Sequence, residues 1–169
     1  MLYYDCFDTP IGRLWFAATP KGLCRIRLAS SEEEFLTSLK RAFEGEPKRE
    51  ERHFKGLIER FKAYFRGEPT SFSDVPLDLR GTDFQKAVWR AVVETPYGRL
   101  STYREVAIRV GRPRAYRAAG NAVGRNPLFI VVPCHRVVRS DGSLGGFGSS
   151  GIELKKYLLR LEGLDLLRK

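Results

Sequence analysis

The segment at residues 68–81 constrains the fold most strongly, because it separates two parts of the sequence with different hydrophobic periodicity. Two prolines and a final glycine interrupt any regular pattern in it, while Leu77 and Leu79 alternate with other residues. We interpret it as a linker with a short extended piece. The chain of 169 residues is therefore predicted to form an N-terminal α/β support domain, linker included, at 1–80 and a C-terminal domain at 81–169.

The N-terminal part shows the alternation of apolar and polar residues that is typical of strands. The alternating stretches are separated by turns and lie at residues 2–7, 14–18 and 23–28. A capping box at Ser31–Glu34 then predicts an amphipathic helix, residues 45–49 break the pattern, and a second amphipathic helix ends near Gly67. We expect a small antiparallel sheet with helices, which has no site of its own and supports the rest of the chain.

The C-terminal part is predicted to be mainly helical, so the fold class is α+β. Helices are expected at residues 84–92, 103–110, 114–123 and 152–161. Capping boxes at Thr82 and Thr102 begin the first two, Pro113 suits the first turn of the third, and Gly124 closes it. Because the second and third helices are short and meet at a turn containing Gly111, they predict a helix-turn-helix.

Positive charge is concentrated in the C-terminal part. The formal net charge is +10, with a balance of +1 over residues 1–80 and +9 over 81–169. A basic domain joined to a neutral one favours a polyanionic partner such as nucleic acid. In the third helix, Arg114 and Arg117 are three residues apart and are expected to project from one face of a slim, alanine-rich helix. The alanines also suit close packing against the core, and both interpretations hold if they use different faces.

Other features exclude further classes of protein. No apolar run is long enough to cross a bilayer, and the first residues lack a signal-peptide pattern, so we expect an intracellular protein. The three cysteines are odd in number and too widely spaced for a disulfide framework or a CxxC metal motif. Cys6 and Cys24 are interpreted as core residues, although a bridge between them, or a partial zinc site with His53, stays open. Only Cys134 has reactive neighbours.

Residues 126–136 contain the most reactive pattern of the chain. An apolar run at 128–132 predicts a buried strand that ends just before Cys134 and His135. A cysteine becomes a strong nucleophile where a base or a positive charge favours its thiolate, and His135 and Arg136 are the nearest candidates. The alternative is that Cys134 is a small buried apolar residue and His135 a surface residue.

A glycine-rich segment follows at residues 142–151, after a predicted strand and tight turn at 137–142. It lacks the GK[ST] ending of a P-loop and the strand-to-helix context of a dinucleotide site, which excludes nucleoside triphosphate chemistry. Its exposed backbone N–H groups suit the lining of a pocket for a flat ligand.

Several linked motifs resemble those of the O6-alkylguanine-DNA alkyltransferases, also called methylated-DNA-protein-cysteine methyltransferases. They are PCHRVV, the preceding GRNP, the predicted helix-turn-helix and the final KxxLLxxEG pattern, in the family's order over residues 82–163. Residues 1–80 resemble the family's N-terminal domain only in length and layout. The resemblance implies a repair enzyme that acts on double-stranded DNA containing O6-alkylguanine, with O4-alkylthymine left open, and transfers the alkyl group to its own cysteine.

The resemblance also implies roles for single residues. Cys134 is the alkyl acceptor, His135 is the base that removes its proton through a water, and Glu162 orients that histidine. Asn126 supports the active-site turn, and Tyr103 gives a proton or a hydrogen bond to the departing guanine. The other residues implied are, for DNA binding, Arg117, Arg114, Ala118, Arg125 and Thr102, and, for the substrate pocket, Val137, Gly145, Phe147, Gly148 and Lys155.

These roles fit a displacement at saturated carbon. Such a reaction needs a soft nucleophile and neutralisation of the charge that grows on the leaving group. The target atom lies inside a stacked duplex, so the nucleotide must flip into a pocket, and Arg117 is expected to fill the gap. Because water does not readily cleave a thioether, each molecule is expected to act once. No cofactor is expected, and the protein should be a monomer in the cytoplasm, or in the nucleus of a eukaryote.

Two positions depart from the family's pattern. Phe147 stands where many members have tyrosine, and Gly148 where some have serine, so base discrimination and tolerance of bulky alkyl groups stay open. The metal ligands found in the N-terminal domain of some members are not reproduced as a set, so no zinc is expected.

Three rival classes remain to be weighed against the alkyltransferase. A lesion-binding relative would lack the acceptor cysteine, and Cys134 within an intact PCHR motif argues against it. A helix-turn-helix regulator would leave the Cys-His-Glu set unexplained. A cysteine hydrolase would have no use for the basic domain or for Arg117.

Overall fold

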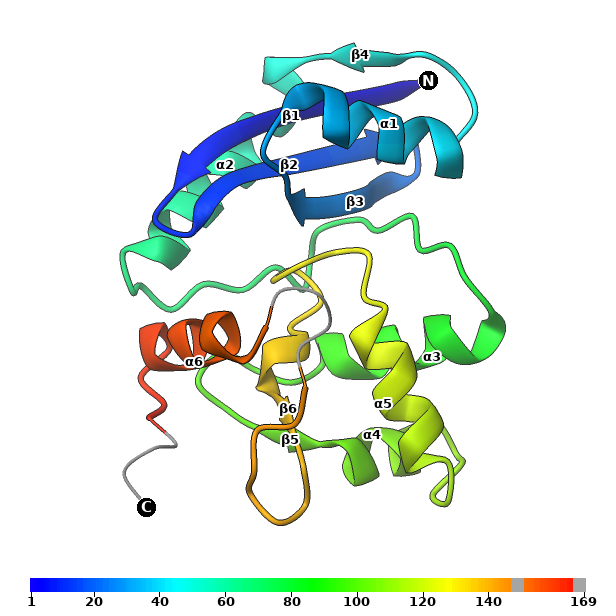
Figure 1. Cartoon of the computed structure of the whole chain (residues 1–169), viewed down its shortest axis with the longest axis vertical. Coiled ribbons are helices and arrows are strands. Elements are labelled where there is room, and N and C mark those ends of the chain that lie inside the picture. The colour runs from blue at the N-terminus through cyan, green and yellow to red at the C-terminus, as the bar shows by residue number, and fades with distance from the viewer. Residues whose placement is uncertain (147–150, 166–169) are drawn as a thin grey trace. The chain divides into compact units, whose positions relative to one another are not determined.

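The computed structural model describes residues 1–146 and 151–165. The chain divides into two compact units, Met1–Arg80 and Gly81–Lys169, and Figure 1 labels their elements. Within the described residues, no helix is both long enough and apolar enough to span a bilayer. Phe147 and Gly148, which were predicted for the substrate pocket, lie outside the described residues.

The first unit is built on a four-stranded sheet in the order β3-β2-β1-β4. Its strands are β1 (Leu2–Thr9), β2 (Gly12–Thr19), β3 (Gly22–Leu28) and β4 (Pro47–Arg49). The first three pair antiparallel, which confirms the predicted sheet. β4 is a correction, because it lies in the predicted break and pairs in parallel with β1. Three residues are too few to show an alternating pattern, so only the pairing with β1 reveals this strand.

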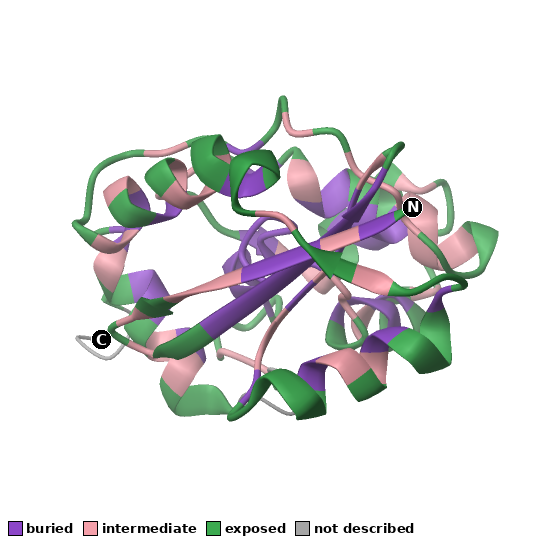
Figure 2. Ribbon diagram, turned by 90° about the horizontal axis from the view of Figure 1, so that it is seen from above, coloured by how far each residue is buried: buried purple, intermediate pink, exposed green. Residues whose placement is uncertain are grey.

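Two helices cover the two faces of this sheet (Figure 1), namely α1 (Glu32–Ala42) and α2 (Glu51–Phe65). Successive residues of a strand point to opposite faces, as Trp15 and Phe16 on β2 illustrate. The ring centroid of Trp15 lies 5.5 Å from that of Phe35 on α1, whereas Phe16 lies 5.1 Å from Phe54 on α2. In Figure 2 the long strands carry buried residues along much of their length, as expected for a sheet covered on both faces.

Part of the predicted linker packs on the first unit. Leu77 forms an isolated parallel bridge with Leu23 of β3. The flanking hydrogen bonds, Leu23 N to Pro76 O and Asp78 N to Leu23 O, measure 2.9 and 2.7 Å. Gly22 permits this approach, since a Cβ atom there would lie 2.4 Å from the Pro76 carbonyl oxygen. The extended piece therefore covers the outer edge of β3, whose backbone groups would otherwise be unpaired.

The second unit is mainly helical, as predicted, with one short parallel strand pair. Its elements are α3 (Asp83–Val93), β5 (Ser101–Thr102), α4 (Tyr103–Arg109), α5 (Tyr116–Gly124), the 3₁₀ turn η1 (Cys134–Arg136), β6 (Val137–Val138) and α6 (Ile152–Leu161). Thr82 and Gln85 form the reciprocal capping box of α3, and Thr102 caps α4. Nε1 of Trp89 on α3 donates to the Ala122 carbonyl of α5 at 2.8 Å, which ties these helices together.

The third predicted helix begins later than expected. α5 starts at Tyr116 and includes Gly124, so Arg114 lies in the turn before the helix and Gly124 does not close it. In that turn the Ala115 amide donates to the Arg112 carbonyl at 2.9 Å. The two arginines expected on one helix face therefore differ in position: Arg114 projects from the turn and Arg117 from the helix. The turn forms its own backbone hydrogen bond before the helix starts, which the apolar periodicity does not indicate.

The apolar run at 128–132 is buried but is not a strand. It forms successive turns, in which the Val132 amide donates to the Leu128 carbonyl at 2.9 Å. Ile130 has a φ of 71°, in the left-handed region that β-branched residues rarely adopt. The prediction was wrong about conformation, because an uninterrupted apolar run indicates burial and not backbone geometry.

Candidate active site

Asn126 shapes the turn that leads to Cys134. Its Nδ2 donates to the Val132 carbonyl and its Oδ1 accepts from the Leu128 amide, both at 2.8 Å. The Cys134 amide also donates to the Val132 carbonyl, at 2.8 Å. Ile130 lies within the loop that these bonds close, and a residue in the left-handed region persists only where its surroundings hold it there. The position of the cysteine is therefore set by the side chain of Asn126.

Cys134 is buried, with 3% of its surface exposed. Burial raises the pKa of its thiol to about 12, while the charge of Lys155 and a hydrogen bond with Asn126 act in the opposite direction. The resting group is therefore a thiol that needs a base for activation. The sequence nominated Arg136 as a charge beside the sulfur, but the Arg136 guanidinium bonds to Glu162 and the nearby positive charge is that of Lys155.

His135 and Glu162 form a buried pair, in which Nε2 of the histidine and Oε2 of the carboxylate are hydrogen-bonded. Burial lowers the pKa of His135, whereas Glu162 acts in the opposite direction. The charges of Arg136 and Lys155 lower this pKa further, so the net shift is downward and the imidazole is neutral. Burial by itself raises the pKa of Glu162, but bonds and charges from His135 and Arg136 lower it to about 2, so the carboxyl is ionised. The alternative of a surface histidine is wrong, and this imidazole is suited to accept a proton.

Arg136 extends this pair into a network. Its Nε donates to Oε1 of Glu162 at 2.8 Å, and its Nη1 donates to the Thr95 carbonyl at 2.7 Å. The Gly98 amide donates to the same Oε1 at 3.1 Å. Sequence reasoning missed both Arg136 and Gly98 as partners of Glu162. One signal in the sequence indicates burial of Arg136, because two valines follow it directly. No local pattern, however, indicates that its partner is Glu162.

Tyr103 lies against the glycine-rich segment. Its hydroxyl donates to the Gly146 carbonyl at 3.5 Å. At Gly145, where φ is 72°, an added Cβ atom would lie 2.9 Å from that hydroxyl, so only glycine fits this approach. Burial raises the pKa of Tyr103, and the charge of Cys134 in its thiolate form raises it further. The phenol therefore keeps its proton and is able to donate a hydrogen bond.

Lys155 is fully buried and joins α6 to the same segment. Its Nζ donates to the carbonyls of Val137, Leu144 and Gly146 at 2.6, 2.5 and 3.3 Å. Nζ also lies 5.8 Å from the ring centroid of Tyr103. Burial lowers the pKa of Lys155 to about 8, against the opposing charge of Cys134. The ammonium group thus holds the segment in place and puts positive charge near the thiol.

The structure brings most of the predicted catalytic and pocket residues into one connected set. Its members are Cys134, His135, Glu162, Asn126, Tyr103, Val137, Gly145 and Lys155. Of the residues predicted for DNA binding, Arg117 and Ala118 lie on α5, Arg114 in the turn before it and Arg125 directly after it, and all four are exposed. Thr102 ends β5, caps α4 and is half-buried. Ala119 and Ala122 are buried, so the alanines of α5 pack inward on one side while Ala118 faces solvent.

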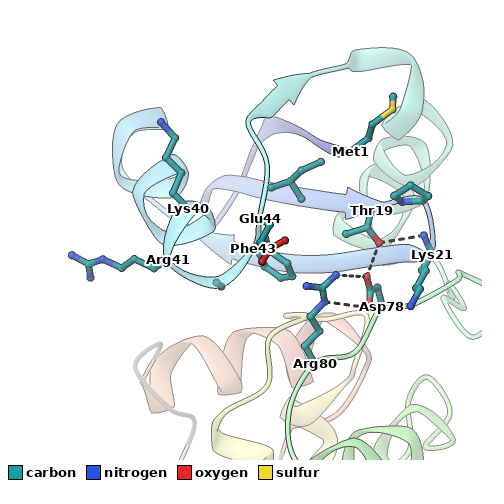
Figure 3. Close-up of a pocket in the computed structure, with 12 residues that line it drawn as sticks. Met1, Thr19, Lys21, Lys40, Arg41, Phe43, Glu44, Asp78 and Arg80 are labelled. Atoms are coloured by element: carbon teal, nitrogen blue, oxygen red, sulfur yellow. Dashed lines mark hydrogen bonds and ion pairs between the residues drawn. The ribbon is translucent and has the colours of Figure 1, made fainter.

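A separate hollow of about 560 Å³ lies in the first unit (Figure 3). In its wall, Oγ1 of Thr19 donates to Asp78 at 2.6 Å and the Arg80 guanidinium donates to the same carboxylate oxygen at 3.1 Å. The guanidinium also lies 4.7 Å from the ring centroid of Phe43. These polar groups satisfy one another. Across residues 1–146 and 151–165, no group of three or more His, Cys, Asp or Glu side chains is placed to hold a metal ion.

Family models match both units. Residues 2–79 match the ribonuclease-like domain of 6-O-methylguanine DNA methyltransferase, and residues 83–164 match the DNA binding domain of the same family. A methylated-DNA--protein-cysteine methyltransferase of Methanosarcina barkeri is 43% identical over 166 residues, which span 98% of this chain and 99% of that protein.

Solved structures agree with the sequence matches. The crystal structure of the Mycobacterium tuberculosis O6-methylguanine methyltransferase has a TM-score of 0.79 at 42% identity and covers 96% of this chain and 93% of that one. A structure of the Mycobacterium tuberculosis protein in complex with DNA has a TM-score of 0.79 at 41% identity, and covers 95% and 93%. These matches confirm the α+β fold and extend the resemblance to residues that the motifs did not cover. The chain belongs to the 6-O-methylguanine DNA methyltransferase family.

Proposed function

We propose that this protein repairs DNA by transferring an alkyl group, typically methyl, from O6 of guanine to Sγ of its own Cys134. The observation that carries the proposal is a buried thiol next in sequence to a neutral, carboxylate-bound imidazole, with the phenol of Tyr103 and the ammonium of Lys155 acting on the same site. The relatives named methylated-DNA--protein-cysteine methyltransferase support the same activity.

Cys134 and His135 start the reaction. His135 takes the proton of the thiol, through a water, and becomes an imidazolium that Glu162 stabilises. The thiolate attacks the methyl carbon, so that the S–C bond forms while the C–O6 bond breaks. The electron pair of that bond passes into the guanine, and Tyr103 stabilises the charge by donating a hydrogen bond or its proton. The charge of Lys155 favours the thiolate during this step.

The product explains why the protein acts once. The methyl group ends in a thioether, in which sulfur bonds to two carbons and water finds no good leaving group. Regeneration would need a second nucleophile to remove the methyl group. The groups that act on the Cys134 thiol, a hydrogen bond with Asn126 and the charge of Lys155, favour its thiolate instead. The protein is therefore a stoichiometric reactant.

Residues of the second unit are proposed to bind the duplex. The α4–α5 pair acts as a helix-turn-helix, and Arg117 in the first turn of α5 enters the stack in place of the flipped nucleotide. Arg114, Ala118, Arg125 and Thr102 contact the DNA around it. The balance of +9 over residues 81–169 supplies the long-range attraction.

The remaining assignments concern the pocket and the whole protein. Val137, Gly145, Phe147, Gly148 and Lys155 are proposed to line the pocket for the flipped base. Residues 1–80 are proposed to support the second domain, and the protein to act as a monomer. The relatives named above come from an archaeon and a bacterium, and a cytoplasmic location fits a repair protein of such cells.

One experiment tests the proposed function against its rivals. The protein is incubated with a duplex oligonucleotide that carries O6-methylguanine, and the added methyl group is located by peptide mass spectrometry. We expect one methyl per protein on Cys134 and none in Cys134→Ser, while Cys6→Ser, which removes a cysteine of the first unit, should react fully. Binding without transfer would indicate a lesion-binding protein, and repeated turnover would exclude the stoichiometric mechanism.

A further inference from the structure

The two oxygens of the Glu162 carboxylate have different partners. Oε2 faces His135, whereas Oε1 accepts from Nε of Arg136 at 2.8 Å and from the Gly98 amide at 3.1 Å. Nη1 of Arg136 is held in turn by the Thr95 carbonyl at 2.7 Å. A carboxylate with both of its oxygens bonded cannot rotate freely, so these contacts fix the direction in which Oε2 points.

The positive charge of Arg136 balances the negative charge of Glu162, the partner of His135. The side chains of Glu162 and His135 have no exposed surface, and that of Arg136 is 7% exposed, so water screens these charges weakly. Two further groups act on His135 and Glu162. The charge of Lys155 on α6 disfavours a proton on His135. Tyr97 interacts with Glu162, and its ring centroid lies 5.8 Å from Cζ of Arg136.

A base that serves Cys134 must meet two opposing demands. Before transfer the imidazole must be neutral, and after it takes the proton the imidazolium must be stabilised. An unbalanced carboxylate in a buried site would meet the second demand too early, because it would draw a proton onto the histidine in the resting protein. A carboxylate already paired with a guanidinium attracts that proton less while still orienting the ring.

We propose that Arg136 is a positioning residue for alkyl transfer, which neutralises Glu162 and directs its Oε2 so that His135 stays neutral until it receives the proton of Cys134. The inference rests on the proposed function, since it concerns the same base. Beyond that function, it assigns control of the proton affinity of His135 to Arg136. In the proposed mechanism Arg136 touches neither the sulfur of Cys134 nor the substrate.

The proposal predicts a change in pH dependence and not only in rate. In Arg136→Gln the unbalanced Glu162 raises the pKa of His135, so the acid limb of the single-turnover methylation rate should move to higher pH, by roughly one to three units. Arg136→Lys keeps the positive charge and should restore a limb close to that of the wild type, at a lower plateau because the fork geometry is lost. A purely structural role would lower the rate by the same factor at every pH.

A second measurement does not depend on transfer, and its first part needs no substitution at Arg136. The chain has two histidines, so His53→Gln leaves His135 as the only imidazole signal in a nuclear magnetic resonance titration. We expect His135 to be neutral at about pH 7 in this background, and to titrate at higher pH when Arg136→Gln is added. An imidazolium at neutral pH with Arg136 present would overturn the proposal.

The two proposals fail in distinguishable ways. If the wild-type protein does not methylate Cys134, the proposed function fails, while the titration of His135 still reports on the role of Arg136. If transfer occurs and Arg136→Gln shows an unmoved acid limb and an unmoved His135 pKa, the function stands and the role of Arg136 is structural only.

Discussion

Several buried or half-buried side chains of this protein make more than one contact each. Asn126 bonds to both ends of a turn, Glu162 accepts from His135 and from Arg136, and Lys155 donates to three carbonyls. Removing one partner of a buried polar group leaves the other without a hydrogen bond, and that costs more than the bond itself is worth. At these positions stability and reactivity should therefore change together.

Asn126→Ala tests this coupling. The substitution removes the bonds to the Val132 carbonyl and the Leu128 amide, so we expect the free energy of unfolding to fall by about 2–4 kcal/mol and the transfer rate to fall as Cys134 loses its fixed position. Denaturant unfolding and single-turnover methylation measure the two effects. Asn121→Ala, at an exposed position of α5, is the stability control and should change it by less than about 0.5 kcal/mol.

His135 predicts how stability depends on pH. Its pKa in the folded protein lies below the ordinary value of 6.5, so the unfolded chain binds this proton first as the pH falls. The stability that neutral His135 contributes is complete above about pH 6.5 and is lost as the pH falls toward the folded pKa, with a slope of at most about 1.4 kcal/mol per pH unit. Unfolding by denaturant, measured from about pH 8 to about pH 5, checks the slope.

Two variants separate this histidine from other titrating groups. His135→Gln should flatten the slope across that interval, whereas His53→Gln in the first unit should leave it unchanged. An unaltered slope in His135→Gln would mean that other groups cause the pH dependence.

At the scale of elements, α5 has one side for the core and another for solvent. Ala119, Ala122 and Val123 are buried, while Arg117 in its first turn is exposed. Arg114 precedes the helix, so in the proposed complex it would approach the duplex from a turn and not from the helix face on which the periodicity placed it. The two arginines should therefore have different tasks.

Arg117→Ala and Arg114→Ala are predicted to differ in their effect on transfer. Each removes one positive charge, so each should weaken DNA binding and reduce the slope of log Kd against log salt concentration by about one. Only Arg117→Ala should slow transfer by more than the loss of binding explains, because the flipped nucleotide loses its replacement in the stack. Equal effects of the two variants on the rate at saturating DNA would contradict this division.

At the scale of the whole molecule, the proposed reaction changes the protein covalently and therefore affects its stability. The proposed acceptor, Cys134, is 3% exposed and lies among the buried residues of the second unit. A methyl group added to its sulfur has to be accommodated in packed surroundings, and overfilling a packed core costs about 1–3 kcal/mol. Repair should therefore weaken the protein that performs it.

The melting temperature is predicted to fall after reaction. A protein of this size loses roughly 2–4 °C of Tm for each kcal/mol, so methylation of Cys134 should lower the Tm by several degrees. Calorimetry before and after complete reaction with methylated duplex measures the shift, once the DNA has been removed. Cys134→Ser treated in the same way should show no change, and an unchanged or higher Tm of the methylated protein would show that the site has room for the adduct.

Local patterns in the sequence predicted the elements that depend on neighbouring residues. Alternation indicated three strands, capping residues such as Thr82 and Thr102 marked helix starts, and the PCHR and LLxxEG motifs identified the family. Each of these signals lies within one short segment, so it is visible before the chain folds.

The tertiary structure alone decided the contacts between distant segments. It paired β4 with β1, turned the run at 128–132 into a loop held by Asn126, and directed Arg136 to Glu162 instead of to Cys134. Apolar periodicity reports which residues are buried, whereas the partner of a buried charge depends on which segments meet in the core. The sequence by itself therefore determined the family and the candidate nucleophile, and only the fold determined the network that is proposed to set the proton affinity of the base.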